Sequence, residues 1–359
     1  MTGILTGSAL GRNGDTPGDG LLDRLESWVP IDLAPVVAGK HPQPIPTLLH
    51  TRDRRDALLY RGRVNGFHGD SGTGKSWLMA GAVAQVLAAG RRAVILDYEA
   101  DEHETVARLL ALGADPFALV GQLVYIRPTD PSTGFAVDQL LDVVDDTVDL
   151  VAVDSLGEAF GVDGIDENSD AEVGPWMRRV PRRIADAGPA VLTIDHSTKA
   201  GDNPLHPSGS KRKRAAITGA SYLVTSTRPP TREQAGTLSL TCAKDRHGTY
   251  RRGGIIVTAD ITPYPDGGVT VNLHRATATT PDMILLIVAK AIVSAAKAED
   301  RPLSRRVLLE LAKVKAASET KRAALDLAVS RGYLSVETGP RGAQLHRWVV
   351  DVDLEQASR

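Results

Sequence analysis

The residues whose types and spacing most clearly predict chemistry form a glycine-rich segment: Gly69-Asp70-Ser71-Gly72-Thr73-Gly74-Lys75-Ser76. The segment fits the pattern G-x-x-x-x-G-K-[ST] of phosphate-binding loops. Its glycines let successive backbone N–H groups point into one concavity, and the helix that opens at Lys75 adds the positive end of its dipole. We predict that this loop, together with Trp77, binds ATP, with Lys75 reaching the β- and γ-phosphates and Ser76 coordinating Mg²⁺.

A carboxylate is also expected to hold the magnesium ion, and Asp154 is the candidate. It directly follows the apolar run Leu150–Val153, and ligands of parallel sheets bind at the carboxyl ends of their strands. An aspartate in this place is often only a strand-end cap. Because Asp154 follows the phosphate loop by about 80 residues, we predict that it is the magnesium aspartate.

Hydrolysis further needs a group that orients and polarises water. The apolar run Ala93–Leu96 ends in Asp97-Tyr98-Glu99-Ala100-Asp101, which offers three carboxylates at the same edge. We predict that Glu99 activates the water, because it lies just beyond the strand. The alternative is that Asp101 and Glu102 only cap the next helix and that Glu99 is solvated.

Two polar features follow the next apolar run, Val191–Ile194. The run is followed by Asp195-His196-Ser197, and His196 is predicted to lie near the γ-phosphate, although a lone histidine is more often structural. Residues 199–214 then hold one acid and five bases: Lys199, Lys211, Arg212, Lys213 and Arg214. We expect a flexible loop that contacts the phosphodiester backbone of DNA; the alternative is an ordinary solvated surface.

The elements that must position these residues alternate along the chain. Nearly unbroken apolar strands are separated by helical stretches from Val64 to Ile194, which predicts an α/β fold with a mainly parallel sheet covered on both faces. Four further strand patterns between Ser221 and His274 lack helices between them, so we expect antiparallel additions. One of these strands ends in Lys244-Asp245-Arg246, whose two cations point the same way.

Composition limits the class of protein. The 359 residues are 42% hydrophobic and 24% charged, as in globular proteins, and the net charge of −2 leaves no overall attraction to nucleic acid. The single cysteine, Cys242, excludes an intrachain disulfide and fits a reducing cytosol. No apolar run is long enough to span a bilayer. We expect a cytoplasmic protein without a membrane partner.

In this order, the phosphate loop, Glu99, Asp154, His196 and the pair Lys244 and Arg246 resemble the RecA-like ATPase core of ring helicases of the DnaB and plasmid RepA type. The resemblance covers roughly residues 58–275, and the segments Trp28–Leu33 and Pro46–Leu49 resemble the start of RepA-type ATPases of actinobacterial phages and mobile elements. It implies a homo-oligomeric ring, hexameric in such helicases, with ATP between subunits. It also implies that Lys244 and Arg246 reach into the neighbour's site.

Four regions are predicted: a disordered leader at 1–27, a proline-rich arm at 28–57, the ATPase domain at 58–275 and a compact helical unit at 281–350. The last region carries a net charge of +5. Its three helical stretches and one hairpin resemble a winged helix, whose third helix would present Lys321 and Arg322 to a DNA groove, with Arg341 in the wing. The alternative is a winged helix that binds protein.

The leading hypothesis is a magnesium-dependent ATPase motor on single-stranded DNA, of replicative-helicase type. One alternative is a recombination mediator that hydrolyses ATP on single strands without unwinding a duplex. Another is an ATP-controlled initiator or regulator whose C-terminal unit binds DNA. The chain contains no Asn-Lys dipeptide, which argues against the usual guanine-reading motif of GTPases.

Overall fold

The computed structural model describes residues 30–40, 43–197, 205–231, 233–276, 283–299 and 301–352. The predicted leader at 1–27 and Lys199 lie outside these residues. The chain divides into two compact units, 1–43 and 44–359. In the first unit the described residues form one helical turn, α1 (Ala34–Val37), which leaves Val36 and Val37 exposed.

The proline-rich arm contains more regular structure than its sequence predicts. Strands β1 (Leu48–His50) and β2 (Ala57–Leu59) pair antiparallel, and Leu58 and Leu59 are fully buried. The prolines all precede β1, so they remove no hydrogen bond from this pair.

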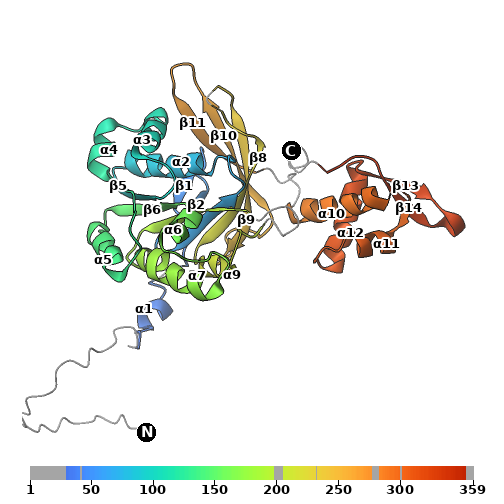
Figure 1. Cartoon of the computed structure of the whole chain (residues 1–359), viewed down its shortest axis with the longest axis horizontal. Helices are drawn as coiled ribbons and strands as arrows, with labels where there is room; N and C mark the ends of the chain where they lie inside the picture. Colours follow the sequence, from blue (N-terminus) through green and yellow to red (C-terminus); the bar gives the residue numbers. More distant parts are fainter. Residues whose placement is uncertain are drawn as a thin grey trace, which may run out of the picture. The chain divides into compact units, whose positions relative to one another are not determined.

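A nine-stranded sheet forms the centre of the second unit, in the order β11-β10-β9-β8-β3-β7-β6-β4-β5 (Figure 1). Six neighbouring strands run parallel, from β5 to β8, and the other three add antiparallel, as predicted. The strands are β3 (Val64–Gly69), β4 (Arg92–Asp97), β5 (Leu123–Ile126), β6 (Val148–Asp154), β7 (Ala190–His196), β8 (Ala220–Arg228), β9 (Gly236–Asp245), β10 (Ile255–Pro263) and β11 (Val269–Arg275).

Helices cover both faces of this sheet, and each face has its own core (Figure 1). In β4, Ala93 and Ile95 belong to one core and Val94 and Leu96 to the other, because successive side chains of a strand point to opposite faces. One core receives α2 (Lys75–Ala88), α3 (Glu102–Ala111) and α4 (Pro116–Gln122). The other receives α5 (Gly134–Val143), α6 (Leu156–Val162), α7 (Asp170–Met177) and α8 (Arg183–Asp186). The fold is therefore α/β, as predicted.

Two local predictions differ from the structure. The last helical stretch before Val191 is not one regular α-helix: a π-helical turn at Arg178–Arg182 separates α7 from α8, because Pro181 has no N–H to donate. The basic segment after residue 204 contains helix α9 (Lys211–Ala216) where a flexible loop was expected. Ser210 caps this helix by accepting a hydrogen bond from the N–H of Arg212 at 3.0 Å.

The C-terminal part contains three helices and a three-stranded antiparallel sheet of order β12-β14-β13. Its elements are α10 (Met283–Glu299), β12 (Leu303–Ser304), α11 (Arg305–Leu311), α12 (Ser318–Ser330), β13 (Leu334–Thr338) and β14 (Gln344–Trp348). The helices and the hairpin lie where the sequence places them, whereas β12 was not expected. Among the described residues, no helix is both long and apolar enough to cross a membrane.

Candidate ATP-binding site

The phosphate loop connects β3 to α2, as its sequence predicts. Gly72 and Gly74 have φ values of +74° and +89°, which only glycine adopts readily. A Cβ at Gly69 would lie 2.2 Å from the carbonyl oxygen of Val224 on the neighbouring strand, so this position has no room for a side chain. The loop therefore depends on glycine for both its conformation and its packing.

The ammonium group of Lys75 lies inside the curve of this loop. Its Nζ donates hydrogen bonds to the carbonyl oxygens of Gly69 and Asp70, each at 2.8 Å, and the residue is buried. Burial lowers the pKa of Lys75, while the nearby Asp154 and Glu99 carboxylates oppose this shift. A charge held here is placed to contact phosphate oxygens bound by the loop.

The structure brings Ser76 and Asp154 together, although they are 78 positions apart in the sequence. The Ser76 hydroxyl donates to Asp154 Oδ2 at 3.0 Å. Burial raises the pKa of Asp154 to about 6, with the Glu99 and Asp97 carboxylates adding to this shift and the hydrogen bond from Ser76 opposing it. A hydroxyl and a carboxylate are oxygen donors that suit Mg²⁺, which takes its remaining ligands from water and phosphates.

No group of three or more His, Cys, Asp or Glu side chains among the described residues could hold a metal ion by itself. A magnesium site that is completed by nucleotide phosphates needs from the chain only donors such as the Ser76 hydroxyl and the Asp154 carboxylate. The residues present therefore fit the ion that the sequence predicts.

Asp97 is occupied by structural hydrogen bonds. Its Oδ1 accepts from the backbone N–H groups of Glu99 and Ala100, at 3.1 and 2.8 Å. Its Oδ2 accepts from the hydroxyls of Thr105 and Tyr125, at 2.9 and 3.0 Å. Asp97 therefore fixes the turn that carries Glu99.

The other two carboxylates of this turn differ from each other. Asp101 caps α3 by accepting from the N–H of Glu104 at 2.8 Å, which also lowers its pKa. The Glu99 carboxylate is exposed and has no hydrogen bond or ion pair within the described ranges of the chain. Of the three, Glu99 alone combines proximity to Lys75 and Asp154 with a carboxylate that is not used for structure.

His196 lies beside the start of the phosphate loop. Strand β7 runs between β3 and β6, and its register pairs His196 with Gly69. The N–H of Ser197 donates to the carbonyl of Gly69 at 3.2 Å, and the Ser197 hydroxyl donates to Asp70. The sheet order thus places the end of β7 between the phosphate loop and Asp154.

The four basic residues Lys211 to Arg214 do not share one environment. Lys211 and Arg212 are exposed on α9, and Arg214 is partly exposed beside His206. Lys213 is buried, with its Nζ 3.1 Å from carboxylate oxygens of both Asp195 and Glu167. The helical repeat turns Lys213 inward, so it is not available as a DNA contact.

The sequence reasoning gave no role to Asp195 or Glu167. In the sequence, Asp195 follows an apolar strand, as Asp154 does. This shared position could have identified Asp195 as a candidate functional residue. Burial raises the pKa of Asp195, whereas the Lys213 ammonium opposes the shift.

Lys244 lies level with the middle of β3, and Arg246 lies toward the edge of the sheet opposite the phosphate loop. Lys244 pairs with Ser221, which pairs with Gly66, and the N–H of Arg246 donates to the carbonyl of Gly219 at 3.1 Å. Arg246 therefore lies near the beginning of β3. At the rise per residue of a β-strand, this is roughly 16 Å from the phosphate loop. This placement excludes a direct role in the chain's own ATP site.

The two cations also differ in their contacts. Lys244 Nζ donates to the carbonyl oxygens of Arg214, Ala215 and Ile217, at 2.8, 3.2 and 2.6 Å. The guanidinium of Arg246 is exposed and makes no hydrogen bond or ion pair with the part of the chain that the structure describes. Arg246 alone of the pair keeps its charged group accessible to a partner.

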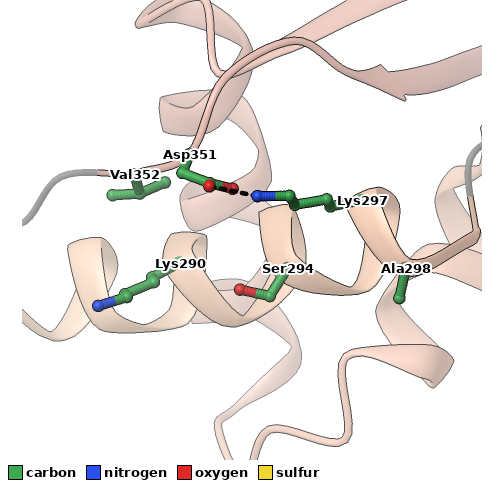
Figure 2. Close-up of a pocket in the computed structure, with 6 residues that line it drawn as sticks. All are labelled: Lys290, Ser294, Lys297, Ala298, Asp351 and Val352. Atoms are coloured by element: carbon green, nitrogen blue, oxygen red, sulfur yellow. Dashed lines mark hydrogen bonds and ion pairs between the residues drawn. The ribbon is translucent and has the colours of Figure 1, made fainter.

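The C-terminal part has a separate hollow of about 470 Å³, lined by Lys290, Ser294, Lys297, Ala298, Asp351 and Val352 (Figure 2). Lys297 Nζ pairs with Asp351 at 2.5 Å and lies over the ring of Trp348. None of the predicted ATP-site residues lines this hollow. Its cations are surface lysines, one of which is already neutralised, so it gives no sign of a ligand site.

The predicted groove-reading helix of this part, α12, has a mixed surface. Lys321 is partly buried, and the exposed row along the helix consists of Glu319, Arg322 and Asp326. Because this row holds two acidic side chains and one basic side chain, its charge does not favour contact with phosphate groups. The winged-helix DNA-binding role remains a prediction that this surface does not strengthen.

Comparison with known proteins gives one match to a family. Residues 32–202, just under half of the chain, match the model of an AAA domain family. The matched segment contains the phosphate loop, Glu99, Asp154 and His196. This segment is similar to AAA domains.

No curated protein matches the sequence. Among solved structures, the crystal structure of the RadB recombinase is similar, with a TM-score of 0.44 and 16% identity over 60% of this chain and 92% of that chain.

Proposed function

We propose that this ATPase is a magnesium-dependent motor that hydrolyses ATP at subunit interfaces and moves on single-stranded DNA, as a ring helicase of replicative type does. The observation that supports it best is the cluster at the carboxyl edge of the sheet. Lys75, the Ser76–Asp154 pair and the unbonded Glu99 carboxylate converge there from β3, β4, β6 and α2.

Each residue has a distinct task in this proposal. The loop amides and Lys75 bind the phosphates, and Ser76 and Asp154 hold Mg²⁺, which neutralises charge that develops on the transferred phosphoryl group. Glu99 orients the attacking water and accepts its proton. His196, beside Gly69, contacts the γ-phosphate side of the site.

The proposed DNA contacts are the exposed bases of α9. Lys211 and Arg212 face solvent, and Arg214 is partly exposed. Lys211 also pairs with Asp170 at 3.2 Å, an exposed pair that costs little to exchange for a phosphate. Lys213 is omitted because it is buried.

The position of Arg246 supports assembly into a ring. A guanidinium on the edge opposite the phosphate loop can complete a site only in another subunit. An arginine supplied in this way stabilises the transferring charge and is worth about a thousandfold or more in rate. We therefore propose that each ATP lies between two copies of the chain.

The direct test is the ATPase rate with and without single-stranded DNA, compared with duplex DNA. We expect Mg²⁺-dependent hydrolysis that single strands stimulate. Hydrolysis that no polynucleotide changes would contradict a DNA motor. In the same preparation, strand displacement distinguishes a helicase from an ATPase that acts on single strands without unwinding them.

A further inference from the structure

Helix α9 is fixed at both ends by buried or half-buried lysines that the sequence assigned to other tasks. Near its beginning, Lys213 Nζ forms ion pairs with Asp195 and Glu167, at 3.1 Å each. The Lys213 side chain is 1% exposed and its ammonium lies 5.2 Å from the centre of the Phe160 ring. The helix is thereby attached to the end of β7.

The attachment point is next to the ATP site. Asp195 Oδ1 accepts hydrogen bonds from both Lys213 Nζ, at 3.1 Å, and the backbone N–H of His196, at 2.9 Å. The register of β3 and β7 pairs Asp195 with His68 and His196 with Gly69. A shift of the β7 end therefore moves the Asp195 carboxylate and the lysine that is bonded to it.

The other end of α9 is attached to the strand that carries Arg246. Lys244 donates hydrogen bonds to carbonyl groups at the C-terminus of α9. The last carbonyl groups of a helix have no donor within the helix, and a cation near them is favourable. Lys244 is only two positions before Arg246. The six-residue helix thus links Asp195 near the end of β7 to Lys244 near the end of β9.

We propose that Lys213 is a positioning residue that couples polymer binding on the outer side of α9 to the ATP site at the end of β7. Lys211 and Arg212 contact the polymer, and the buried Lys213–Asp195 pair transmits the resulting shift to His196 and the phosphate loop. The same shift reaches Arg246 through Lys244. This inference rests on the proposed DNA-stimulated ATPase and assigns its coupling to one ion pair.

A neutral pair of nearly equal size tests the coupling. Lys213→Met alone leaves a charged Asp195 buried without its partner and is expected to fold poorly. Lys213→Met/Asp195→Asn removes both charges and keeps the volume. The matched control is Lys211→Met, which removes an exposed charge from the same helix.

The measurements are kcat with saturating single-stranded DNA, kcat without DNA, and the DNA concentration that gives half-maximal stimulation. For the double variant we expect the ratio of the two kcat values to fall to about 1, while hydrolysis without DNA continues. Lys211→Met should raise the half-maximal DNA concentration and keep the wild-type ratio. A wild-type ratio in the double variant would overturn the coupling.

A second readout needs no DNA. Hydrogen exchange of the amides of 211–216 is compared with and without Mg²⁺ and a non-hydrolysable ATP analogue. We expect the analogue to change exchange in the wild type and in Lys211→Met, but not in the double variant. An equal change of hydrogen exchange in the double variant would refute the proposed coupling. If DNA does not stimulate the ATPase of the wild type, the proposed function is refuted instead.

Discussion

The two edges of the central sheet carry different parts of the proposed ATP site. At the carboxyl edge, Lys75, Ser76 and Asp154 contact one another or the loop. At the opposite edge, Arg246 presents an exposed charge with no phosphate loop near it. In the proposed function, the first edge would bind nucleotide by itself, whereas the second would act on the site of a neighbouring copy.

The turn around Arg246 shows that this exposure is maintained by structure. Asp245 accepts hydrogen bonds from the hydroxyl of Tyr60 and from the backbone N–H groups of His247 and Tyr250. The hydrogen bonds to Asp245 thus fix the conformation of the turn. The Arg246 side chain, which lies between Asp245 and His247, stays exposed. Breaking either edge should therefore give defects that can be told apart.

The largest effect is expected at the carboxyl edge. Lys75→Ala removes the charge that contacts the β- and γ-phosphates, so hydrolysis should fall to background. The measurement is the steady-state ATPase rate with and without single-stranded DNA. Lys290→Ala, a cation of the C-terminal part, serves as the control and should keep wild-type activity.

A substitution at the opposite edge should lower the ATPase rate nearly as much, but mixing with a second variant should restore part of the rate. Arg246→Ala alone should lose about a thousandfold in rate, because its phosphate loops lack the charge from the next subunit. Mixed with Lys75→Ala, some interfaces pair an intact loop with an intact Arg246, and partial ATPase should return. Mixing without recovery, when subunit exchange is demonstrated separately, would contradict action between subunits.

Within the carboxyl edge, binding and turnover should separate. Glu99→Gln should keep ATP affinity and lose about 100-fold or more in turnover, because the phosphate contacts remain and water activation is lost. Asp97→Asn should instead lower stability, because the hydrogen bonds to Thr105 and Tyr125 are weakened. Wild-type turnover in Glu99→Gln would move the role to another residue.

A smaller effect concerns stability and its pH dependence. The pKa of Asp154 is raised from 3.8 to about 6, so the folded state without Mg²⁺ binds this proton more tightly than the unfolded chain. The charged form costs on the order of 3 kcal/mol above pH 6, and the cost disappears as pH falls below 4. Asp154→Asn should therefore stabilise the metal-free protein at pH 7 to 8.

Denaturant unfolding in chelator at pH 7.5 and at pH 4 measures this difference. The stabilisation by Asp154→Asn should be present at the higher pH and absent at the lower one. An equal effect at both pH values would show that the charge of Asp154 is not its cause.

The smallest effect is expected from the exposed bases of α9. Replacing Lys211, Arg212 and Arg214 by Ala should weaken the binding of single-stranded DNA. It should also lower the slope of log affinity against log salt by up to about 2, because binding releases fewer counterions when phosphate contacts are lost. ATPase without DNA is the control for folding. An unchanged slope would make these residues ordinary solvated surface.

Much of this site was predictable from the chain alone. The spacing of the glycines, Lys75 and Ser76 defines a phosphate loop in any context where a strand precedes it and a helix follows. Apolar runs that end in Asp97, Asp154 and His196 predict a common edge, because parallel strands end together. These inferences succeed because they depend on local backbone geometry and on strand direction.

Other assignments needed the tertiary structure, because residues of the same type stand side by side in the sequence. Nothing local distinguishes Lys213 from Lys211, but the path of α9 buries the first against Asp195 and exposes the second. Likewise, Asp97 is consumed by Thr105 and Tyr125, which leaves Glu99 unbonded.

The sequence by itself determined the loop chemistry and the alternation of strands and helices, since both follow from short-range spacing. Only the tertiary structure decided the order of the strands, which sets β7 between β3 and β6 and puts Arg246 at the far edge from Lys75. The physical reason is that strand order and burial depend on contacts between distant segments, which no single stretch of sequence encodes.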